Sequence, residues 1–391
     1  MTDVFLKPRK EQSLERRHPW VFSGAIKKID GQVQNGDLVN VRANKGRFLA
    51  KGVYSEGSIA IRILSFEEEP IDEDFIFDQL KKAWEKRSAL GLVENQTTNI
   101  FRWVHAEGDH LPGLIIDVYG DTAVIQAHSI GMHRLVLPVA ERFMEISHGT
   151  IKNVFDKSGT TLKKQGIEID NSYLLGEKST SKLIENSVYF KIDWENGQKT
   201  GFFIDQRFNR NLLKRYSNEK IVLNTFCYTG GFSLYALQGG ASKVISLDSS
   251  QSALELVEEN IEWNHFQSKK HETVKADAVE YLKQLPEDID IIVLDPPAFA
   301  KHMSARHQAI QGYKRINSHA IRQIKSGGII FTFSCSQVID KKLFRDTVLA
   351  AAINANRKVR ILHQLHQPAD HPINIYHPEG EYLKGLVLEV E

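Results

Sequence analysis

Residues 221–248, IVLNTFCYTGGFSLYALQGGASKVISLD, decide the fold of the region that contains them. An apolar, β-branched run at 221–226 leads into a turn that carries Gly230 and Gly231. A helix-like stretch follows, and a second apolar run ends at Asp248. This order of strand, glycine turn, helix and strand with a terminal acid predicts the first unit of a nucleotide-binding α/β sheet.

The turn favours one kind of ligand. Its glycines let a ligand approach the backbone, and the helix N-terminus offers N–H donors. Asp248 stands where a ribose diol would reach the second strand. The turn reads Tyr228-Thr229-Gly-Gly and lacks the GxGxxG spacing of a pyrophosphate loop. It suits a cofactor with an adenosine and an amino-acid tail, so we expect S-adenosylmethionine. The alternative is any parallel α/β domain with a tight turn.

The composition indicates an ordinary globular protein. The 391 residues are 41% apolar and 25% charged, enough for two or three domains. The sequence has no eighteen-residue apolar run and no charged-then-apolar N-terminus, so we expect no membrane span and a cytoplasmic location. Two cysteines, Cys227 and Cys335, are too few for a disulfide framework or a cysteine zinc site, and no metal is expected.

Residues 1–70 predict a small β-barrel that binds RNA. Apolar and polar residues alternate in short runs separated by glycine turns. Residues 1–64 hold twelve Lys or Arg against six Asp or Glu, and a local excess of this kind is typical of an RNA-contacting module. A merely solvated basic face is the alternative. The motif HPWVFSGAI at 18–26 resembles the first segment of a PUA domain, an RNA-binding β-barrel.

Residues 71–185 predict a small α+β central domain, because one stretch of helical spacing is followed by several short strand patterns. Within it, His105 and Asp117 are interpreted as turn or surface residues rather than catalytic groups. Beyond it, a β-hairpin is predicted with its turn at Asn196-Gly197.

Residues 186–391 predict a doubly wound α/β domain. Helical patterns separate the strands, except between the last two, and this arrangement fits a Rossmann-like class I methyltransferase sheet of seven mixed strands. The predicted strands lie near 221–227, 243–248, 272–276, 290–295, 328–334, 359–364 and 385–390.

Polar residues follow four of these strands, where ligands of parallel sheets bind. They are Asp248 with Ser249, Asp277 with Ala278, Asp295 in Asp-Pro-Pro-Ala-Phe, and Cys335 in Ser-Cys-Ser. Asp277 is expected to accept a hydrogen bond from an adenine amino group. It is equally expected to cap the helix that begins at Ala278, and the two roles are compatible.

Cys335 and Asp295 together indicate a specific chemistry. Carbon-5 of cytosine is too weak a nucleophile to take a methyl group unaided, but a thiolate that adds to carbon-6 makes carbon-5 enolate-like. An acid must then hold the ring at N3 and the 4-amino group. The two prolines after Asp295 stiffen the backbone that would present this acid. A buried structural cysteine is the alternative for Cys335, and Cys227 is interpreted as a packing residue or a neighbour of the cofactor loop.

A second chemistry is compatible with the Asp-Pro-Pro turn. Amino-directed nucleic-acid methyltransferases use a similar (Asn/Asp)-Pro-Pro-(aromatic) turn without a nucleophile. Here Ala298 occupies the fourth position and the aromatic residue is Phe299, which weakens this alternative.

Several motifs in order resemble the bacterial large-subunit ribosomal RNA cytosine-C5 methyltransferase family with an N-terminal PUA domain. They are NTFCYTGGFSLYAL, ISLDSSQSALELVEENIEWN, DIIVLDPPAF, GYKRIN, GGIIFTFSCS, QPADHP and HPEGEYLKGL. The resemblance implies that Cys335 is the nucleophile, Asp295 the base-orienting acid, and S-adenosylmethionine the cofactor. It also implies contacts to the cofactor from a lid segment at 199–207. The expected cofactor-binding residues are Phe203, Gln206, Tyr228, Thr229, Gly230, Gly231, Asp248, Ser249, Asp277, Ala278 and Asp295.

The resemblance leaves several points open. Many RNA cytosine-C5 methyltransferases carry a second cysteine in the fourth-strand motif, and neither this chain nor the family it resembles has one. His371, Tyr382 and Lys384 are further pocket candidates with no assigned role. The expected partner is RNA, a non-catalytic RNA-binding factor is the alternative to an enzyme, and a homodimer is one of the possible oligomeric states.

Overall fold

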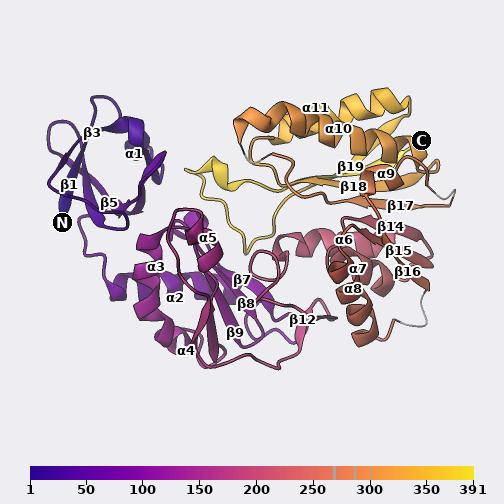
Figure 1. Cartoon of the computed structure of the whole chain (residues 1–391), viewed down its shortest axis with the longest axis horizontal. Helices are drawn as coiled ribbons and strands as arrows, with labels where there is room; N and C mark the ends of the chain where they lie inside the picture. Colours follow the sequence, from indigo (N-terminus) through magenta and orange to yellow (C-terminus); the bar gives the residue numbers. More distant parts are fainter. Residues whose placement is uncertain (267–269, 286–287, 301) are drawn as a thin grey trace. The chain divides into compact units, whose positions relative to one another are not determined.

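The computed structural model describes residues 1–266, 270–285, 288–300 and 302–391. The chain divides into two compact units (Figure 1). The first holds Met1–Ile184, Ile192–Ile204 and Ala369–Gly380. The second holds Glu185–Lys191, Asp205–Pro368 and Glu381–Glu391.

The first unit begins with a six-stranded sheet. Its strands, in sheet order, are β2 Trp20–Phe22, β6 Ile59–Ser65, β5 Phe48–Tyr54, β4 Leu38–Arg42, β1 Thr2–Leu6 and β3 Ile26–Asp30; α1 Gln12–Glu15 and the 3-10 turn η1 Ser23–Ala25 connect them. Alternate residues of β4, Val39 and Val41, are fully buried, as the apolar–polar alternation predicts. The N-terminal sheet expected from the sequence is confirmed.

The rest of the first unit is a five-stranded sheet with helices. Its strands, in sheet order, are β11 Ser172–Leu175, β10 Asn153–Asp156, β9 Thr122–Ala127, β8 Leu114–Tyr119 and β7 Ile100–His105. Its helices are α2 Glu73–Ala89, η2 Ala106–Asp109, α3 Ile130–Val136, η3 Leu137–Arg142, α4 Phe143–Ile146 and α5 Gly159–Lys163. Trp103 and Phe143 pack edge to face in the buried core of this region. The α+β character is therefore confirmed.

The interpretation of His105 and Asp117 as turn or surface residues is wrong. Both end up buried in strands β7 and β8. The carboxylate of Asp117 accepts two hydrogen bonds from the Arg102 guanidinium, at 2.8 and 2.9 Å, and one from the Thr200 hydroxyl at 2.5 Å. Burial, with the charges of neighbouring groups such as His371 and Arg102, holds the pKa of His105 well below its ordinary value.

The predicted hairpin at Asn196-Gly197 is also wrong. The two-stranded sheet of this region pairs β12 Leu183–Glu185 with β13 Val188–Phe190, and the turn residues are Asn186 and Ser187. Both have positive φ, at 49° and 64°, as a two-residue hairpin turn needs. Asn196 lies in a loop, where the Asp193 carboxylate accepts from the backbone N–H of residues 195 and 196.

The second unit is built on a seven-stranded sheet, as predicted. Its strands, in sheet order, are β16 Lys270–Lys275, β15 Lys243–Asp248, β14 Ile221–Thr225, β17 Ile291–Leu294, β18 Gly328–Ser334, β20 Lys384–Val390 and β19 Val359–Leu365. The five strands from β16 to β18 run parallel, and β20 is antiparallel to both of its neighbours. The ends of β14, β15, β17 and β18 therefore meet along one edge.

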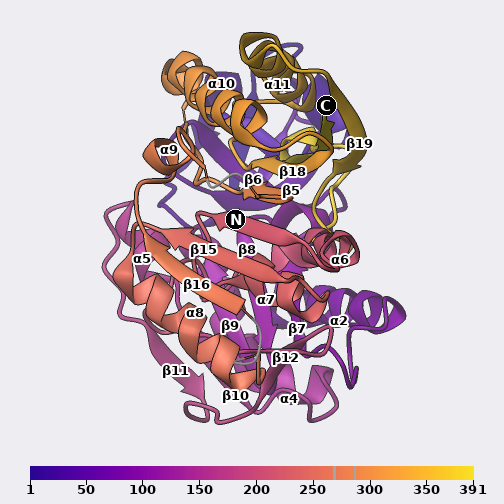
Figure 2. The same cartoon turned by 90° about the vertical axis from the view of Figure 1, so that its right-hand side faces the viewer.

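Helices cover both faces of this sheet. They are η4 Ile204–Gln206, which ends in this unit, α6 Arg207–Tyr216, α7 Gly231–Gln238, α8 Gln251–Trp263, α9 Ala278–Tyr281, η5 Met303–Ala305, α10 Arg306–Gln323 and α11 Lys341–Ala355. Figures 1 and 2 show α10 and α11 on one side of the sheet and α6, α7 and α8 on the other. Central strands buried on both faces read as apolar runs, which is why the sequence predicted them well.

One segment near the C-terminal end of the sequence belongs to the first unit. Residues 369–380, with the 3-10 turn η6 Pro378–Gly380, lie between β19 and β20 in sequence. The Asp370 carboxylate accepts from the backbone N–H of Arg102 at 3.0 Å, and the Asp370 carbonyl accepts from Arg87 at 2.8 Å. The segment is thus anchored by buried polar groups.

No helix in the described ranges combines the length and the apolar character needed to cross a membrane.

Candidate active site

The glycine turn after β14 is shaped by its backbone. Gly230 has φ +81°, in the left-handed region, and a Cβ there would lie 3.0 Å from a methyl group of Val257. The preceding residue, Thr229, is held through its carbonyl, which accepts from the side-chain amide of Asn260 at 3.0 Å. Both the conformation and the close approach of α8 therefore require glycine at position 230.

A buried ion pair supports Gly231 from behind. A Cβ at Gly231 would lie 3.2 Å from Cδ of Arg210. Arg210 donates to both carboxylate oxygens of Glu185, at 2.9 and 2.8 Å, and both side chains are buried. The Tyr235 hydroxyl also donates to Glu185, at 2.9 Å. This network therefore holds α7 at both Gly231 and Tyr235.

Asp248 ties the ends of the first two strands together. One carboxylate oxygen accepts from the backbone N–H of Tyr228 at 3.0 Å, and the other accepts from Ser250 N–H at 3.0 Å. The side chain is half-buried, and the next residue, Ser249, is exposed. The predicted juxtaposition of Asp248 with the glycine turn is confirmed, and each carboxylate oxygen keeps capacity for a further donor.

Asp277 serves as a helix cap. Its carboxylate accepts from the backbone N–H of Glu280 at 2.9 Å, at the start of α9, and the side chain is exposed. Ala278, the first helical residue, is buried. The capping role weighed from the sequence is confirmed, and the exposed carboxylate stands at the end of β16, next to β15.

Asp295 is positioned by a side-chain relay. Its carboxylate accepts from the Gln206 amide at 3.1 Å, and the Gln206 carbonyl oxygen accepts from Asn209 at 2.6 Å. Gln206 and Asn209 are buried, and Asp295 is half-buried. The structure therefore brings together Gln206 and Asp295, which are 89 residues apart.

Phe203 belongs to the first unit, where the Lys199 ammonium lies 4.2 Å from the centre of its ring.

Cys335 directly follows β18, next to the strand that carries Asp295, and its side chain is half-buried. The adjacent Ser336 is buried. Its hydroxyl lies 2.9 Å from the Tyr313 hydroxyl, and it accepts a hydrogen bond from the backbone N–H of Ala300 at 3.4 Å. These bonds join the loop that begins at Asp295 to the loop that carries Cys335, as the neighbouring strand ends predicted.

The two cysteines have contrasting surroundings. Cys227 is buried, and burial, followed by the negative charge of Asp248, raises the pKa of its thiol well above the ordinary value. It is therefore a poor nucleophile. Cys335 is the more accessible thiol of the two, and neither forms a disulfide. The prediction of Cys227 as a packing residue fits its burial.

Lys384, a pocket candidate with no assigned role, is a buried cation that contacts the loop of Cys335. Its ammonium donates to the carbonyl oxygens of Ser336 at 2.8 Å and Tyr382 at 2.7 Å. Burial lowers the pKa of Lys384 to about 8, and the neighbouring Cys335 and Glu381 oppose that shift. The register of β20 against β18 sets Lys384 opposite Ser334, so the motif could mark it as a pocket candidate but could not predict its contacts.

Across the described ranges, no group of three or more His, Cys, Asp or Glu side chains is arranged to hold a metal ion.

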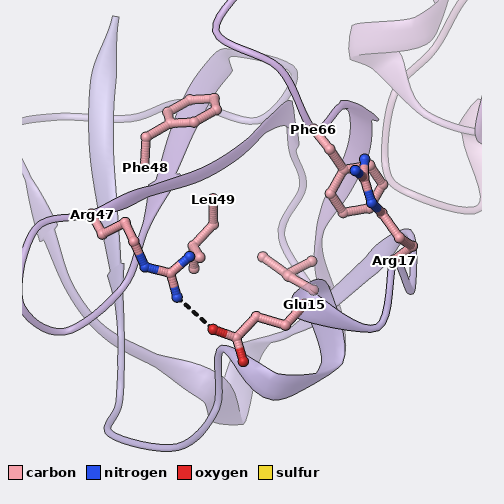
Figure 3. A pocket seen from close by; sticks show the side chains of 7 residues that line it. Glu15, Arg17, Arg47, Phe48, Leu49 and Phe66 are labelled. Carbon is pink, nitrogen blue, oxygen red and sulfur yellow. Dashed lines mark hydrogen bonds and ion pairs between the residues drawn. The ribbon is translucent and has the colours of Figure 1, made fainter.

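A second candidate site lies in the N-terminal sheet of the first unit. A hollow of about 310 Å³ is lined by residues that include Arg17 and Arg47, whose side chains are drawn in Figure 3. The Arg17 guanidinium lies 5.0 Å from the centre of the Phe66 ring, and Arg47 is paired with Glu15. The remaining lining residues are Leu14, Phe48 and Leu49. Cations beside aromatic rings are the usual surroundings of an unstacked nucleobase and its phosphate.

Two family models match the sequence. A model of the PUA-like domain matches residues 4–66, and a model of the S-adenosylmethionine-dependent methyltransferases matches residues 167–381. The first covers the N-terminal sheet with its hollow. The second covers every residue predicted to be catalytic or to bind the cofactor.

Relatives match over nearly the whole chain. The protein named ribosomal RNA large subunit methyltransferase I of Aeromonas salmonicida is 40% identical, over 98% of each chain. Its namesake in Pseudoalteromonas translucida is also 40% identical, over 99% of each chain.

Solved structures share the fold at lower identity. A chain from Streptococcus mutans, provisionally described as an S-adenosylmethionine-dependent methyltransferase, is 21% identical over all of both chains, with a TM-score of 0.85. A methyltransferase solved in complex with S-adenosylhomocysteine (SAH) is likewise 21% identical over all of both chains, with a TM-score of 0.86.

Proposed function

Since the chain belongs to the S-adenosylmethionine-dependent methyltransferases, in one family with the ribosomal RNA large subunit methyltransferase I proteins, we propose that it methylates carbon-5 of a cytosine in large-subunit ribosomal RNA. Cys335 is the covalent nucleophile and Asp295 orients the base. Residues 1–70 act as the PUA-like RNA-binding domain, 71–185 as the central domain and 186–391 as the catalytic domain.

The strand-end residues fit S-adenosylmethionine. The left-handed φ of Gly230 and its close packing on Val257 give the tight turn whose backbone the cofactor would approach. Asp248 would accept from the ribose hydroxyls, and Asp277 from the adenine amino group. Gln206 and the turn residues would complete the contacts. When bound, the cofactor supplies the electrophilic methyl group that carbon-5 takes up.

Cys335 provides the nucleophile that cytosine needs. Its thiolate adds to carbon-6, forming a carbon–sulfur bond and moving the ring electrons onto carbon-5. After methylation, a base takes the carbon-5 proton, the carbon–sulfur bond breaks, and the thiolate is restored. The motif Asp-Pro-Pro-Ala-Phe offers no second cysteine for this step, so the base is water or another side chain.

Asp295 holds the ring while the adduct forms. Its carboxyl group, aligned by Gln206, would bind N3 and the 4-amino group of cytosine. In this role it is protonated, or it binds a base protonated at N3, because the ring gains negative charge when the thiolate adds. The buried Gln206–Asn209 relay limits the rotation of the carboxyl group and so preserves its alignment.

One observation carries this proposal: the half-buried Cys335 is joined through Ser336 to the loop of Asp295. A nucleophile beside the acid is needed for carbon-5 chemistry and has no function in amine methylation. The Asp-Pro-Pro turn keeps amine methylation as the second candidate. A non-catalytic RNA-binding factor is the third.

The methylated atom separates these candidates. The protein should transfer labelled methyl groups from S-adenosylmethionine to unmodified large-subunit ribosomal RNA, and digestion should recover the label in 5-methylcytidine. Label in N4-methylcytidine or a methylated purine would refute the carbon-5 assignment and leave the methyltransferase family intact. RNA binding with no cofactor binding in calorimetry would favour the non-catalytic factor.

The hollow of Figure 3 is proposed as an RNA contact of the PUA-like domain. Replacing Arg47 by Gln should weaken RNA binding and make its salt dependence less steep by about one unit of the log–log slope, because one phosphate contact is lost. Arg360→Gln is the matched control, since Arg360 is an equally exposed arginine on the edge strand of the other unit. Equal affinity and slope for the two variants would exclude the hollow as an RNA contact.

A further inference from the structure

A buried lysine, Lys384, pairs with the last residue of the strand that leads to Cys335. Strands β18 and β20 are antiparallel, and Ser334 pairs with Lys384 in their register. Lys384 is only 3% exposed, whereas lysine side chains are almost never fully buried unless they are paired. Its burial beside the loop of Cys335 therefore calls for a functional explanation.

Backbone carbonyl groups hold the Lys384 ammonium on two sides. Its Nζ donates to Ser336 O at 2.8 Å and to Tyr382 O at 2.7 Å. An ammonium has three N–H donors, so these two bonds fix its direction and leave the third for a group next to it. Ser336 directly follows Cys335, so one of the two carbonyl groups belongs to the very loop that presents the thiol.

The charged groups around Lys384 leave Cys335 as its partner. Two acids lie nearby, Glu381 and Asp340. Glu381 is paired with Lys341 at 2.5 Å, and Asp340 caps α11 by accepting from Leu343 N–H at 2.8 Å. Tyr313 of α10 contributes a neutral hydroxyl, because burial raises its pKa. The group whose charge compensates best for burial of the lysine is the Cys335 thiolate, which is the first of the opposing influences on the pKa of Lys384.

We propose that the Lys384 ammonium holds Cys335 as the reactive thiolate, which makes Lys384 a positioning residue for methyl transfer. The inference rests on the proposed role of Cys335 and deepens it. The thiol proton leaves to water, the ammonium keeps its own proton throughout, and the sulfur electron pair becomes available for carbon-6. A similar arrangement of thiolate and cation activates cysteines in other enzymes.

Alkylation of the thiol tests this without any methyl transfer. The chain has only two cysteines and Cys227 is buried, so iodoacetamide reports on Cys335 in the folded protein. In Lys384→Gln, which removes the charge and keeps an N–H donor, alkylation at neutral pH should slow about tenfold, the usual order for loss of one close opposite charge. The pH at which the rate is half-maximal should rise. Lys384→Arg keeps the charge and should stay near the wild-type profile.

A second neutral variant and a direct report of unfolding complete the test. Lys384→Met serves as a second neutral variant if the glutamine variant unfolds, and alkylation of Cys227 reports unfolding directly. Unchanged pH profiles in both neutral variants would overturn the inference. The proposed function fails separately: if Cys335→Ala keeps full turnover, Cys335 is not the nucleophile, whatever the effect of Lys384 on its alkylation.

Discussion

Replacement of Cys335 by alanine should reduce methyl transfer about a thousandfold or more, as removal of a covalent nucleophile commonly does. Cytosine carbon-5 then lacks the activation that addition at carbon-6 provides, and no other thiol is available because Cys227 is buried. Cofactor binding should persist, since the residues proposed to hold S-adenosylmethionine lie at other strand ends. Single-turnover transfer of labelled methyl groups to large-subunit ribosomal RNA measures the loss, and calorimetry measures cofactor binding.

The matched control for that variant is Cys227→Ala, which removes the other thiol of the chain. Its turnover should stay near the wild-type level, because this side chain packs in the interior and its thiol is a poor nucleophile. If Cys335→Ala retains the turnover of Cys227→Ala, the covalent mechanism is excluded and amine methylation becomes the leading candidate.

Replacement of Asp109 by alanine should destabilise the first unit by about 3–5 kcal/mol, the usual cost of leaving one member of a buried ion pair alone. Asp109 accepts from both terminal nitrogens of Arg87, at 2.7 and 2.6 Å, and from the backbone N–H of His105 at 2.8 Å. Arg87 and Asp109 are both buried. Without the carboxylate, the guanidinium stays in the interior with only the carbonyl groups of Arg102 and Asp370.

Chemical denaturation, monitored by hydrogen exchange in the first unit, measures this loss of stability. Asp74→Ala is the control, because the ion pair of Asp74 with Arg142 is exposed and should contribute nothing measurable. The double variant Arg87→Met, Asp109→Leu should recover much of the stability, since it removes both charges together. A single Asp109 variant as stable as the Asp74 control would contradict this interpretation of the pair.

The catalytic sheet could be predicted because its information is local. The run at 291–294 is buried and continuously apolar, and the run at 221–225 begins with three apolar residues before the buried Asn224 and Thr225. Gly230 marks the turn, because glycine readily adopts the positive φ that this position has. The candidate residues at strand ends followed from the rule that parallel strands present their carboxyl ends at one edge.

Other features depend on partners far away in sequence. Asp117 reads as a surface acid, but Arg102 and Thr200 make it a buried one. Asp370 follows β19 in the chain, yet it is held by groups near residues 87 and 102. Such burial is set by tertiary pairing, which no local pattern encodes.

At residues 196–197, a local sequence signal for a hairpin turn does not decide the structure. Asn-Gly is the strongest short hairpin signal, yet Asn196 lies in a loop because Asp193 satisfies the backbone there. The pair at 186–187 forms the hairpin turn, with serine in a conformation that usually favours glycine. Lys384 was a pocket candidate, but its contacts could not be predicted, because they follow from the antiparallel register of β20.

The covalent adduct itself tests the central claim most directly. RNA transcribed with 5-fluorocytidine has no proton to lose from carbon-5, so the adduct cannot resolve after methylation. Incubated with S-adenosylmethionine, the wild-type protein should form a complex with this RNA that survives denaturing electrophoresis, and peptide mapping should place the bond at Cys335. A stable complex that forms equally well with Cys335→Ala, or complete turnover of the fluorinated RNA without any adduct, would contradict the account.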